Sequence, residues 1–305
     1  MARKVKISSV SISGVGQGDN HKQRAIENML HWLDLASKDG PDIICLPETY
    51  TGLGCGGPKW FETREPIPGP SFDAVSTWAG KHKTYVILPM VRIKGRRSFN
   101  SAVLIDRKGQ FIGAYDKIHP TIGEIKAGIT PGKKAHVFDT DFGRIGFAIC
   151  FDLNFRDVGE GLYRNGAEMV FFPSMYRGGL QLSIWAHDFH YWVVSATPGE
   201  QSAIVNPLGR VQLQSHAHGR VITREINLDS EVLHLDENMN RFEALKNKYG
   251  DQVELEIASP EAVFLMTCHH SRKTVQDIIR EFKFETRDKY FSRANRIRSK
   301  ALKRA

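Results

Sequence analysis

The chain has 305 residues, 41% hydrophobic and 25% charged, a length that suits one large α/β domain with an appendage. No run approaches the ~20 apolar residues of a membrane helix, residues 1–5 carry no segment of signal-peptide type, and the four cysteines are too scattered for a disulfide framework or a zinc cage. We therefore expect a cytoplasmic protein with reduced thiols, and only the net charge of +8 suggests an anionic partner.

The N-terminal part of the chain predicts a β-α-β unit. Residues 5–12 alternate apolar and polar side chains, which indicates a half-buried strand. Residues 19–37 carry apolar side chains at helical spacing, and residues 42–47 form a short apolar run that a proline closes. This order is typical of an α/β sheet.

The same alternation continues along the body of the chain. Further strands are predicted at 85–93, 101–105, 145–150, 168–172 and 202–205, and further helices at 72–82, 157–165, 182–192 and 238–248. A turn signal at 107–109 predicts a hairpin over 101–114. Because no repeat or linker divides this stretch, we predict one domain over residues 1–271.

The last segment, residues 272–305, differs in charge from the rest. It holds 12 Lys and Arg against four Asp and Glu, which leaves 30 basic and 30 acidic residues in the first 271. Apolar side chains from Val275 to Phe282 follow helical spacing and predict an amphipathic helix. We expect a basic C-terminal extension that is solvated or faces a protein partner, and we do not expect nucleic acid as the partner.

Three segments place a reactive side chain at or just beyond a predicted strand end, where α/β sheets assemble their sites. They bring a carboxylate, Glu48, an amine, Lys117, and a thiol, Cys150. A thiol needs a base or a nearby positive charge to act as a nucleophile at neutral pH, and Glu48 can be that base. A fixed ammonium such as Lys117 can stabilise the oxyanion that forms when the thiolate attacks a carbonyl.

Taken together, these segments resemble the signatures of the nitrilase superfamily, the carbon-nitrogen hydrolases. The motifs are Leu46-Pro47-Glu48, the Lys117 of Tyr-Asp-Lys-Ile-His-Pro, and Ile149-Cys150-Phe151-Asp152, in the order that this family has them. The resemblance extends through Phe172-Pro-Ser-Met and Val193-Val-Ser-Ala, and it covers about residues 5–228.

The resemblance implies a fold and a mechanism. The fold would be a four-layer α-β-β-α sandwich, with Glu48, Lys117 and Cys150 as a catalytic triad. The enzyme would transfer an acyl group from an amide to the thiol and hydrolyse the thioester without a metal or another cofactor. Glu124 lies where many members have a second glutamate, and the backbone N–H of Phe151 would join the oxyanion hole.

The residues after the cysteine bear on the substrate. Nitrile-hydrolysing members typically have Trp-Glu there, whereas Phe151-Asp152 resembles the amidase and carbamoylase branches. The arginine pair that binds N-carbamoyl-D-amino acids is replaced by Leu153 and Asn154. Side chains near the predicted strand ends are candidates for the substrate pocket: Tyr50, Met175, Tyr176 and Arg177. For Trp60 and Trp185 we favour ordinary core packing.

We therefore predict a thiol amidohydrolase that cleaves a linear amide or an N-carbamoyl C–N bond. Members of the family usually associate, so we expect a homodimer or a larger homo-oligomer. Two alternatives remain open: transfer of the acyl group to an amine acceptor, and a non-catalytic scaffold protein with a vestigial site.

Overall fold

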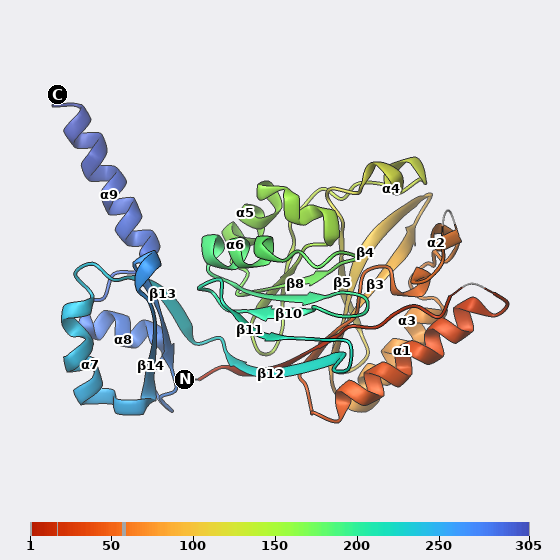
Figure 1. Cartoon of the computed structure of the whole chain (residues 1–305), viewed down its shortest axis with the longest axis horizontal. Coiled ribbons are helices and arrows are strands. Elements are labelled where there is room, and N and C mark those ends of the chain that lie inside the picture. The colour runs from red at the N-terminus through yellow and green to blue at the C-terminus, as the bar shows by residue number, and fades with distance from the viewer. Residues whose placement is uncertain (1, 17, 57–58, 305) are drawn as a thin grey trace. The chain divides into compact units, whose positions relative to one another are not determined.

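The computed structural model describes residues 2–16, 18–56 and 59–304. By its internal contacts the chain forms two compact units, Val5–Glu225 and Met1–Lys4 with Ile226–Ala305 (Figure 1). The boundary expected between 271 and 272 therefore lies inside the second unit, because residues on both sides of it share one hydrophobic core.

Two six-stranded sheets form the centre of the larger unit. The first has the strand order β12-β1-β2-β3-β4-β5. Its members are β1 (Lys4–Val10), β2 (Ile43–Cys45), β3 (Tyr85–Lys94), β4 (Arg97–Ile105), β5 (Phe111–Asp116) and β12 (Val221–Asn227). The pairs β1–β2 and β2–β3 are parallel, and β3–β4–β5 is an antiparallel meander that includes the predicted hairpin.

The second sheet repeats this plan with the order β11-β10-β9-β8-β7-β6. Its members are β6 (Val137–Asp139), β7 (Arg144–Phe147), β8 (Met169–Pro173), β9 (Trp192–Ala196), β10 (Ala203–Val205) and β11 (Val211–Gln214). Strands β7, β8 and β9 run parallel, so their carboxyl ends meet at one edge of the sheet.

Helices cover the outer faces of both sheets (Figure 1). Against the first sheet pack α1 (His21–Ser37) and α3 (Pro70–His82), and against the second pack α5 (Arg156–Arg164) and α6 (Leu180–Phe189). Buried serines contact one another between the two sheets: the Ser9 hydroxyl donates to the Ser195 carbonyl at 2.6 Å, and Ser11 contacts Ser202. These layers are the predicted α-β-β-α sandwich.

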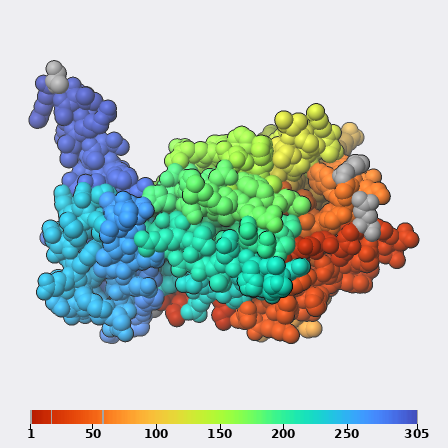
Figure 2. Space-filling model, in the orientation of Figure 1, coloured from red at the N-terminus to blue at the C-terminus, as the bar shows by residue number. Residues whose placement is uncertain are grey.

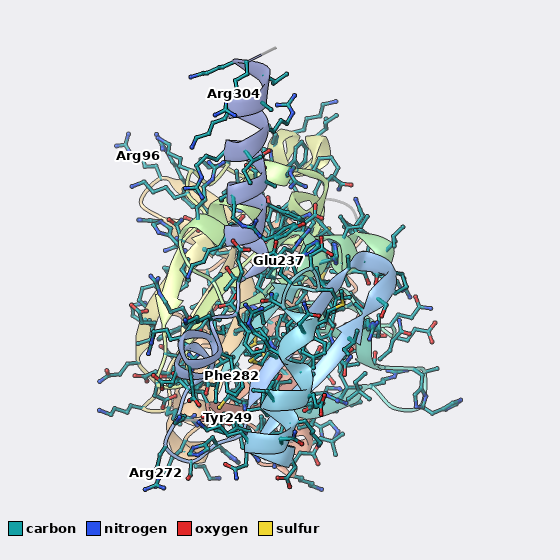
Figure 3. The ribbon with its side chains drawn as sticks, turned by 90° about the vertical axis from the view of Figure 1, so that its left-hand side faces the viewer. Arg96, Glu237, Tyr249, Arg272, Phe282 and Arg304 are labelled. Atoms are coloured by element: carbon teal, nitrogen blue, oxygen red, sulfur yellow. The ribbon has the colours of Figure 1, made fainter. Side chains whose placement is uncertain are left out.

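The smaller unit has an antiparallel sheet in the order β13-β15-β14, made of β13 (Ser230–His234), β15 (Val263–Cys268) and β14 (Val253–Ala258). Helices α7 (Phe242–Tyr249) and α8 (Val275–Phe282) pack against it, and Figure 3 shows Tyr249 and Phe282, whose ring centroids lie 6.0 Å apart. Helix α8 occupies the predicted range and begins with a capping box of Thr274 and Asp277.

The last helix, α9 (Arg287–Leu302), was not predicted, because its sequence has too few apolar residues to show a buried stripe. None of its described residues is buried, and it extends away from the rest of its own unit (Figure 2). Tyr290 anchors its first turn by donating to Asp236 at 2.6 Å and stacking on His234 at 4.0 Å. Across the described residues, no helix is long and apolar enough to span a bilayer.

Candidate active site

Glu48 lies in the turn that follows β2, a strand of the first sheet. Its side chain is 3% exposed, and both of its oxygens accept hydrogen bonds. Oε1 accepts from Asn100 Nδ2 and Lys117 Nζ, both at 2.8 Å, and Oε2 accepts from the backbone N–H of Met175 at 2.9 Å. The next residue, Thr49, has φ 43°, in the left-handed region that turns the chain sharply into η1 (Tyr50–Gly52).

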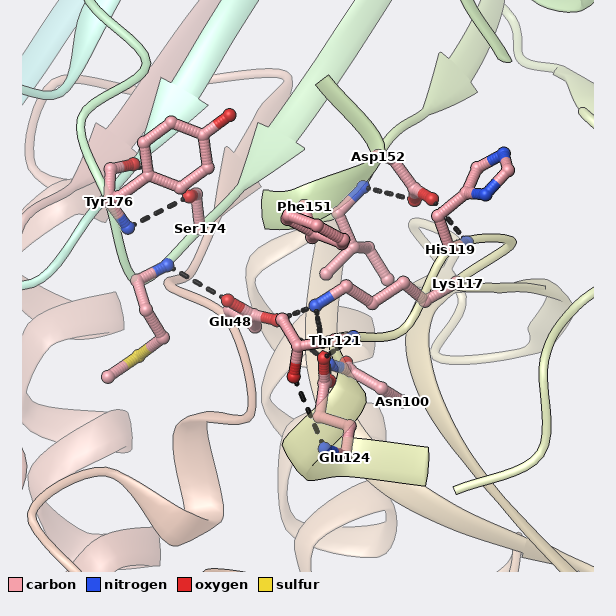
Figure 4. Close-up of polar contacts among 12 residues, drawn as sticks. Glu48, Asn100, Lys117, His119, Thr121, Glu124, Phe151, Asp152, Ser174 and Tyr176 are labelled. Atoms are coloured by element: carbon pink, nitrogen blue, oxygen red, sulfur yellow. Dashed lines mark hydrogen bonds and ion pairs between the residues drawn. The ribbon is translucent and has the colours of Figure 1, made fainter. Parts of the chain in front are cut away.

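Lys117 comes directly after β5, and its side chain is 1% exposed. Its ammonium lies between two carboxylates, because it also donates to Glu124 at 2.9 and 3.1 Å (Figure 4). Burial disfavours its charge, but the negative charges of Glu48 and Glu124 outweigh burial and raise the pKa of Lys117. The side chain therefore stays cationic in a site with little solvent.

Glu124 lies in the short helix α4 (Ile122–Lys126), where sequence resemblance placed it. It forms a capping box with Thr121, whose backbone N–H donates to the Glu124 carboxylate at 2.7 Å. Asn100 donates to both glutamates, at 2.8 Å to Glu48 and 2.7 Å to Glu124. Burial opposes the charge of Glu124, but Lys117 and these donors hold its pKa below the ordinary value.

Cys150 begins η2 (Cys150–Asn154), so the strand predicted to reach it ends earlier, at Phe147. Its φ of 49° is unusual for a residue with a side chain and marks a sharp turn at this point. Burial and the charge of Glu48 raise the pKa of the Cys150 thiol to about 12, against the lowering effect of Lys117. The resting thiol is therefore neutral at physiological pH, and a base has to remove its proton.

Asp152 joins the cysteine loop to the lysine loop. It is fully buried, and its oxygens accept from the backbone N–H of His119 at 2.8 Å, the hydroxyl of Tyr115 at 2.8 Å and the backbone N–H of Ile149 at 2.9 Å. Burial raises the pKa of this carboxyl, and the three donors counter that effect. Asp152 thus fixes the segments that carry Lys117 and Cys150 relative to each other.

A pocket of about 530 Å³ opens in front of these groups. Its described lining comprises the three predicted triad residues, the predicted Glu124 and Met175, and nine further residues: Thr49, Gly52, Gly54, Cys55, Trp60, Asn100, Thr121, Gly123 and Ala127. Trp60 therefore lines the pocket, although the sequence favoured core packing for it. Trp185 is buried in the core, as predicted.

The other predicted pocket residues lie elsewhere among the described residues. Tyr50 is buried, and its hydroxyl accepts from Asn28 at 2.8 Å. Tyr176 packs on Phe172, and Arg177 is exposed. Phe151 was predicted for its backbone N–H, and its side chain packs edge to face on Phe155. Tyr50, Tyr176 and Arg177 follow Glu48 or Met175 closely in the sequence, but none of the three is among the described lining residues of the pocket.

Asn100, Thr121 and Asp152 contribute to the site without having been predicted. Asn100 lies within β4, and nothing in the local sequence separates it from an ordinary strand residue. Asp152 could have been found from its position in the sequence. It comes two residues after Cys150, and the turn that begins at Cys150 buries it. Within the ranges that the structure describes, no group of three or more His, Cys, Asp or Glu side chains is placed to hold a metal ion.

Comparison with known proteins connects this geometry to a family. The model of the carbon-nitrogen hydrolase family matches residues 9–232. A hydrolase of Schizosaccharomyces pombe is 27% identical over 205 residues, which are 58% of this chain and 63% of that protein. The ω-amidase NIT3 of Saccharomyces cerevisiae is 24% identical over 266 residues, which are 76% of this chain and 90% of that protein.

Solved structures share the fold of this chain. The crystal structure of Saccharomyces cerevisiae Nit3, described as a member of branch 10 of the nitrilase superfamily, superposes with a TM-score of 0.64 at 21% identity. The superposition covers 81% of this chain and 94% of that one. At this identity the likeness concerns the fold alone.

Proposed function

The chain belongs to the carbon-nitrogen hydrolase family, whose members cleave C–N bonds other than peptide bonds, and from this premise we propose that it is a thiol amidohydrolase acting on a linear amide or N-carbamoyl group. The observation that carries the proposal is the joint placement of a thiol, a carboxylate and an ammonium around one pocket.

Acylation begins with the neutral thiol. Glu48 takes the proton of Cys150 as the sulfur attacks the carbonyl carbon of the amide, and the C=O bond becomes an oxyanion. All three N–H groups of the Lys117 ammonium already donate to Glu48 and Glu124, so Lys117 stabilises this oxyanion through its charge. The backbone N–H of Phe151 supplies a hydrogen bond to it.

Collapse of the tetrahedral intermediate breaks the C–N bond. Glu48 returns the proton to the departing nitrogen, which leaves as ammonia or an amine, and the acyl group stays on the sulfur as a thioester. Water then enters, Glu48 removes one of its protons, and attack on the thioester releases the carboxylic acid. The proton on Glu48 returns to the sulfur, which restores the neutral thiol.

Glu124 and Asn100 act as positioning residues in this mechanism. Glu124 accepts hydrogen bonds from the Lys117 ammonium beside Glu48, and Asn100 fixes both carboxylates. The base keeps an orientation in which Oε2 is held by the backbone of Met175.

Ammonia release from a panel of linear amides and N-carbamoyl compounds tests the proposal. We expect release by the natural chain and none by Cys150→Ala, with Cys268→Ala as the matched control because that cysteine lies in the smaller unit. Mass spectrometry of the intact chain should find the acyl group on Cys150 during turnover. Activity that survives Cys150→Ala would rule the mechanism out.

A further inference from the structure

The side chains around Cys150 offer no free positive charge to a substrate. The pocket wall is made of apolar side chains, hydroxyls and glycine backbone: Trp60, Ala127 and Met175, Thr49 and Thr121, and Gly52, Gly54 and Gly123. Among the described lining residues, Lys117 is the only Lys or Arg.

Lys117 cannot bind a substrate carboxylate without giving up an existing contact. An ammonium has three N–H donors, and here one points at Glu48 and two at Glu124, over 2.8 to 3.1 Å. Its charge is likewise already matched, because two carboxylates face one ammonium.

The site therefore carries a net negative charge before the substrate enters. Both oxygens of Glu48 accept hydrogen bonds, as do both oxygens of Glu124, so both groups are present as carboxylates. With Cys150 neutral, two negative charges stand against the one positive charge of Lys117. A second anion in this pocket is repelled, and among the described lining residues it finds no Lys or Arg side chain other than Lys117 to offset the repulsion.

Cations near the pocket are engaged or lie outside it. Arg24 donates to the backbone carbonyl of Val15 at 3.2 Å. On the Cys55 side, Lys59 and Glu62 of α2 (Lys59–Glu62) bring opposite charges to the same region. Arg177 is exposed and does not belong to the lining.

We propose that the acyl part of the substrate is uncharged or cationic, and that the pocket rejects amides bearing a carboxylate. This inference rests on the proposed function, because it concerns a substrate. The charge of the pocket can also be measured without any hydrolysis. The wall also fits an apolar acyl chain, since Trp60 and Met175 provide the contact surface.

Three amides of similar size and different charge test the inference during turnover. They are 4-methylpentanamide, which is neutral, 4-amino-4-oxobutanoate, which has a carboxylate in place of the isopropyl group, and 4-aminobutanamide, which is cationic. We expect kcat/KM for the neutral and cationic amides to exceed that for the anion by roughly 10- to 100-fold. Equal or faster hydrolysis of the carboxylate would overturn the inference and leave the amidohydrolase proposal intact.

Alkylation of Cys150 measures the same property without hydrolysis. Iodoacetamide is neutral and iodoacetate is an anion, and their rate ratio at Cys150, read by mass spectrometry, is compared with their ratio at 2-mercaptoethanol. We expect the protein to disfavour iodoacetate by at least about tenfold more than the free thiol does. A ratio equal to that of the free thiol would refute the inference, even if no amide in the panel were hydrolysed.

A charge added to the pocket should reverse the preference. Met175→Arg places a guanidinium on the wall, at a side chain that is 50% exposed and tolerates the change, and Met175→Gln is the uncharged control. We expect the arginine variant to lose most of the discrimination against iodoacetate and the glutamine variant to keep it. Arg177→Ala should leave the discrimination unchanged. A discrimination that rises in this variant would show that Arg177 supplies positive charge to the pocket, and would refute the argument from the lining.

Discussion

Replacing Glu48 with glutamine separates the two effects of this residue on the thiol. The substitution preserves shape and removes one negative charge and the general base. Glu48 now accepts from Asn100 and Lys117 with one oxygen and from the Met175 backbone with the other. A glutamine has one acceptor oxygen, so its NH₂ group must face a donor on one side.

The expected magnitudes follow from these contacts. Loss of the general base should lower kcat by roughly 10² to 10⁴-fold. Loss of one buried hydrogen bond should lower the free energy of unfolding by about 1 to 3 kcal/mol. Burial is the largest cause that raises the pKa of Cys150 from its ordinary value of 9.0 to about 12, and the charge of Glu48 and its hydrogen bond add to it, so replacing Glu48 should lower that pKa.

The assay therefore has two readings that move in opposite directions. Ammonia release should fall, while the thiolate, followed by its ultraviolet absorbance or by iodoacetamide alkylation across alkaline pH, should form at lower pH than in the natural chain. Glu27→Gln on the exposed face of α1 is the matched control. A loss of kcat below tenfold, or a thiolate that forms at higher pH, would refute the assignment of Glu48 as the base.

Three further predictions concern the loops, the smaller unit and the tail. Asp152→Asn should lower the free energy of unfolding in denaturant by about 2 kcal/mol, because an amide cannot accept from all three donors that the carboxylate satisfies. Asp157→Asn, at an exposed carboxylate, is the control, and an equal effect of the two substitutions would contradict the argument. Hydrogen bonds from Lys248, Lys273 and Tyr249 lower the pKa of Glu281 from 4.5 to about 2, so the stability that they provide is present above pH 4.5 and is lost as the pH falls toward 2. Acid unfolding of the natural chain, followed by circular dichroism, should therefore depend more steeply on pH in this range than that of Glu281→Gln, and identical curves would argue against the linkage. Deleting residues 294–305 removes five Lys and Arg of a chain with net charge +8, so retention on a cation-exchange column should fall while kcat/KM stays unchanged, and a loss of activity would show that the tail assists catalysis.

The sequence predicted the grouping of Glu48, Lys117 and Cys150 better than the wall of the pocket. Glu48, Lys117 and Cys150 each follow a strand, and strand ends are readable from apolar runs closed by turns. Asn100 and Trp60 reach the site through packing between segments that are distant in the sequence. Asn100, for example, contacts Glu48, which lies 52 residues earlier in the chain. The direction of a side chain after a sharp turn also depends on distant parts of the chain. The sequence therefore did not show that Tyr50 and Tyr176 stay outside the described lining of the pocket.

The C-terminal part shows a different limit. The apolar spacing from Val275 to Phe282 predicted α8 because this helix buries a stripe on its own sheet. Helix α9 has no buried residue and so shows no periodic signal. Thr286 at its N-cap, whose side chain accepts from the backbone N–H of Lys289, is a start signal that could have been read.

The division of the site between two sheets has a consequence for its geometry. Glu48, Asn100 and Lys117 come from strands written in the first 117 codons, whereas Cys150 and Met175 come from the sheet that follows, and the serines between the sheets hold the two halves in register. The distance between Glu48 in one half and Cys150 in the other therefore depends on how the two sheets pack, and serine hydroxyls make part of that contact. A change that shifts one sheet against the other would therefore separate the carboxylate from the thiol, even with every residue of the site intact.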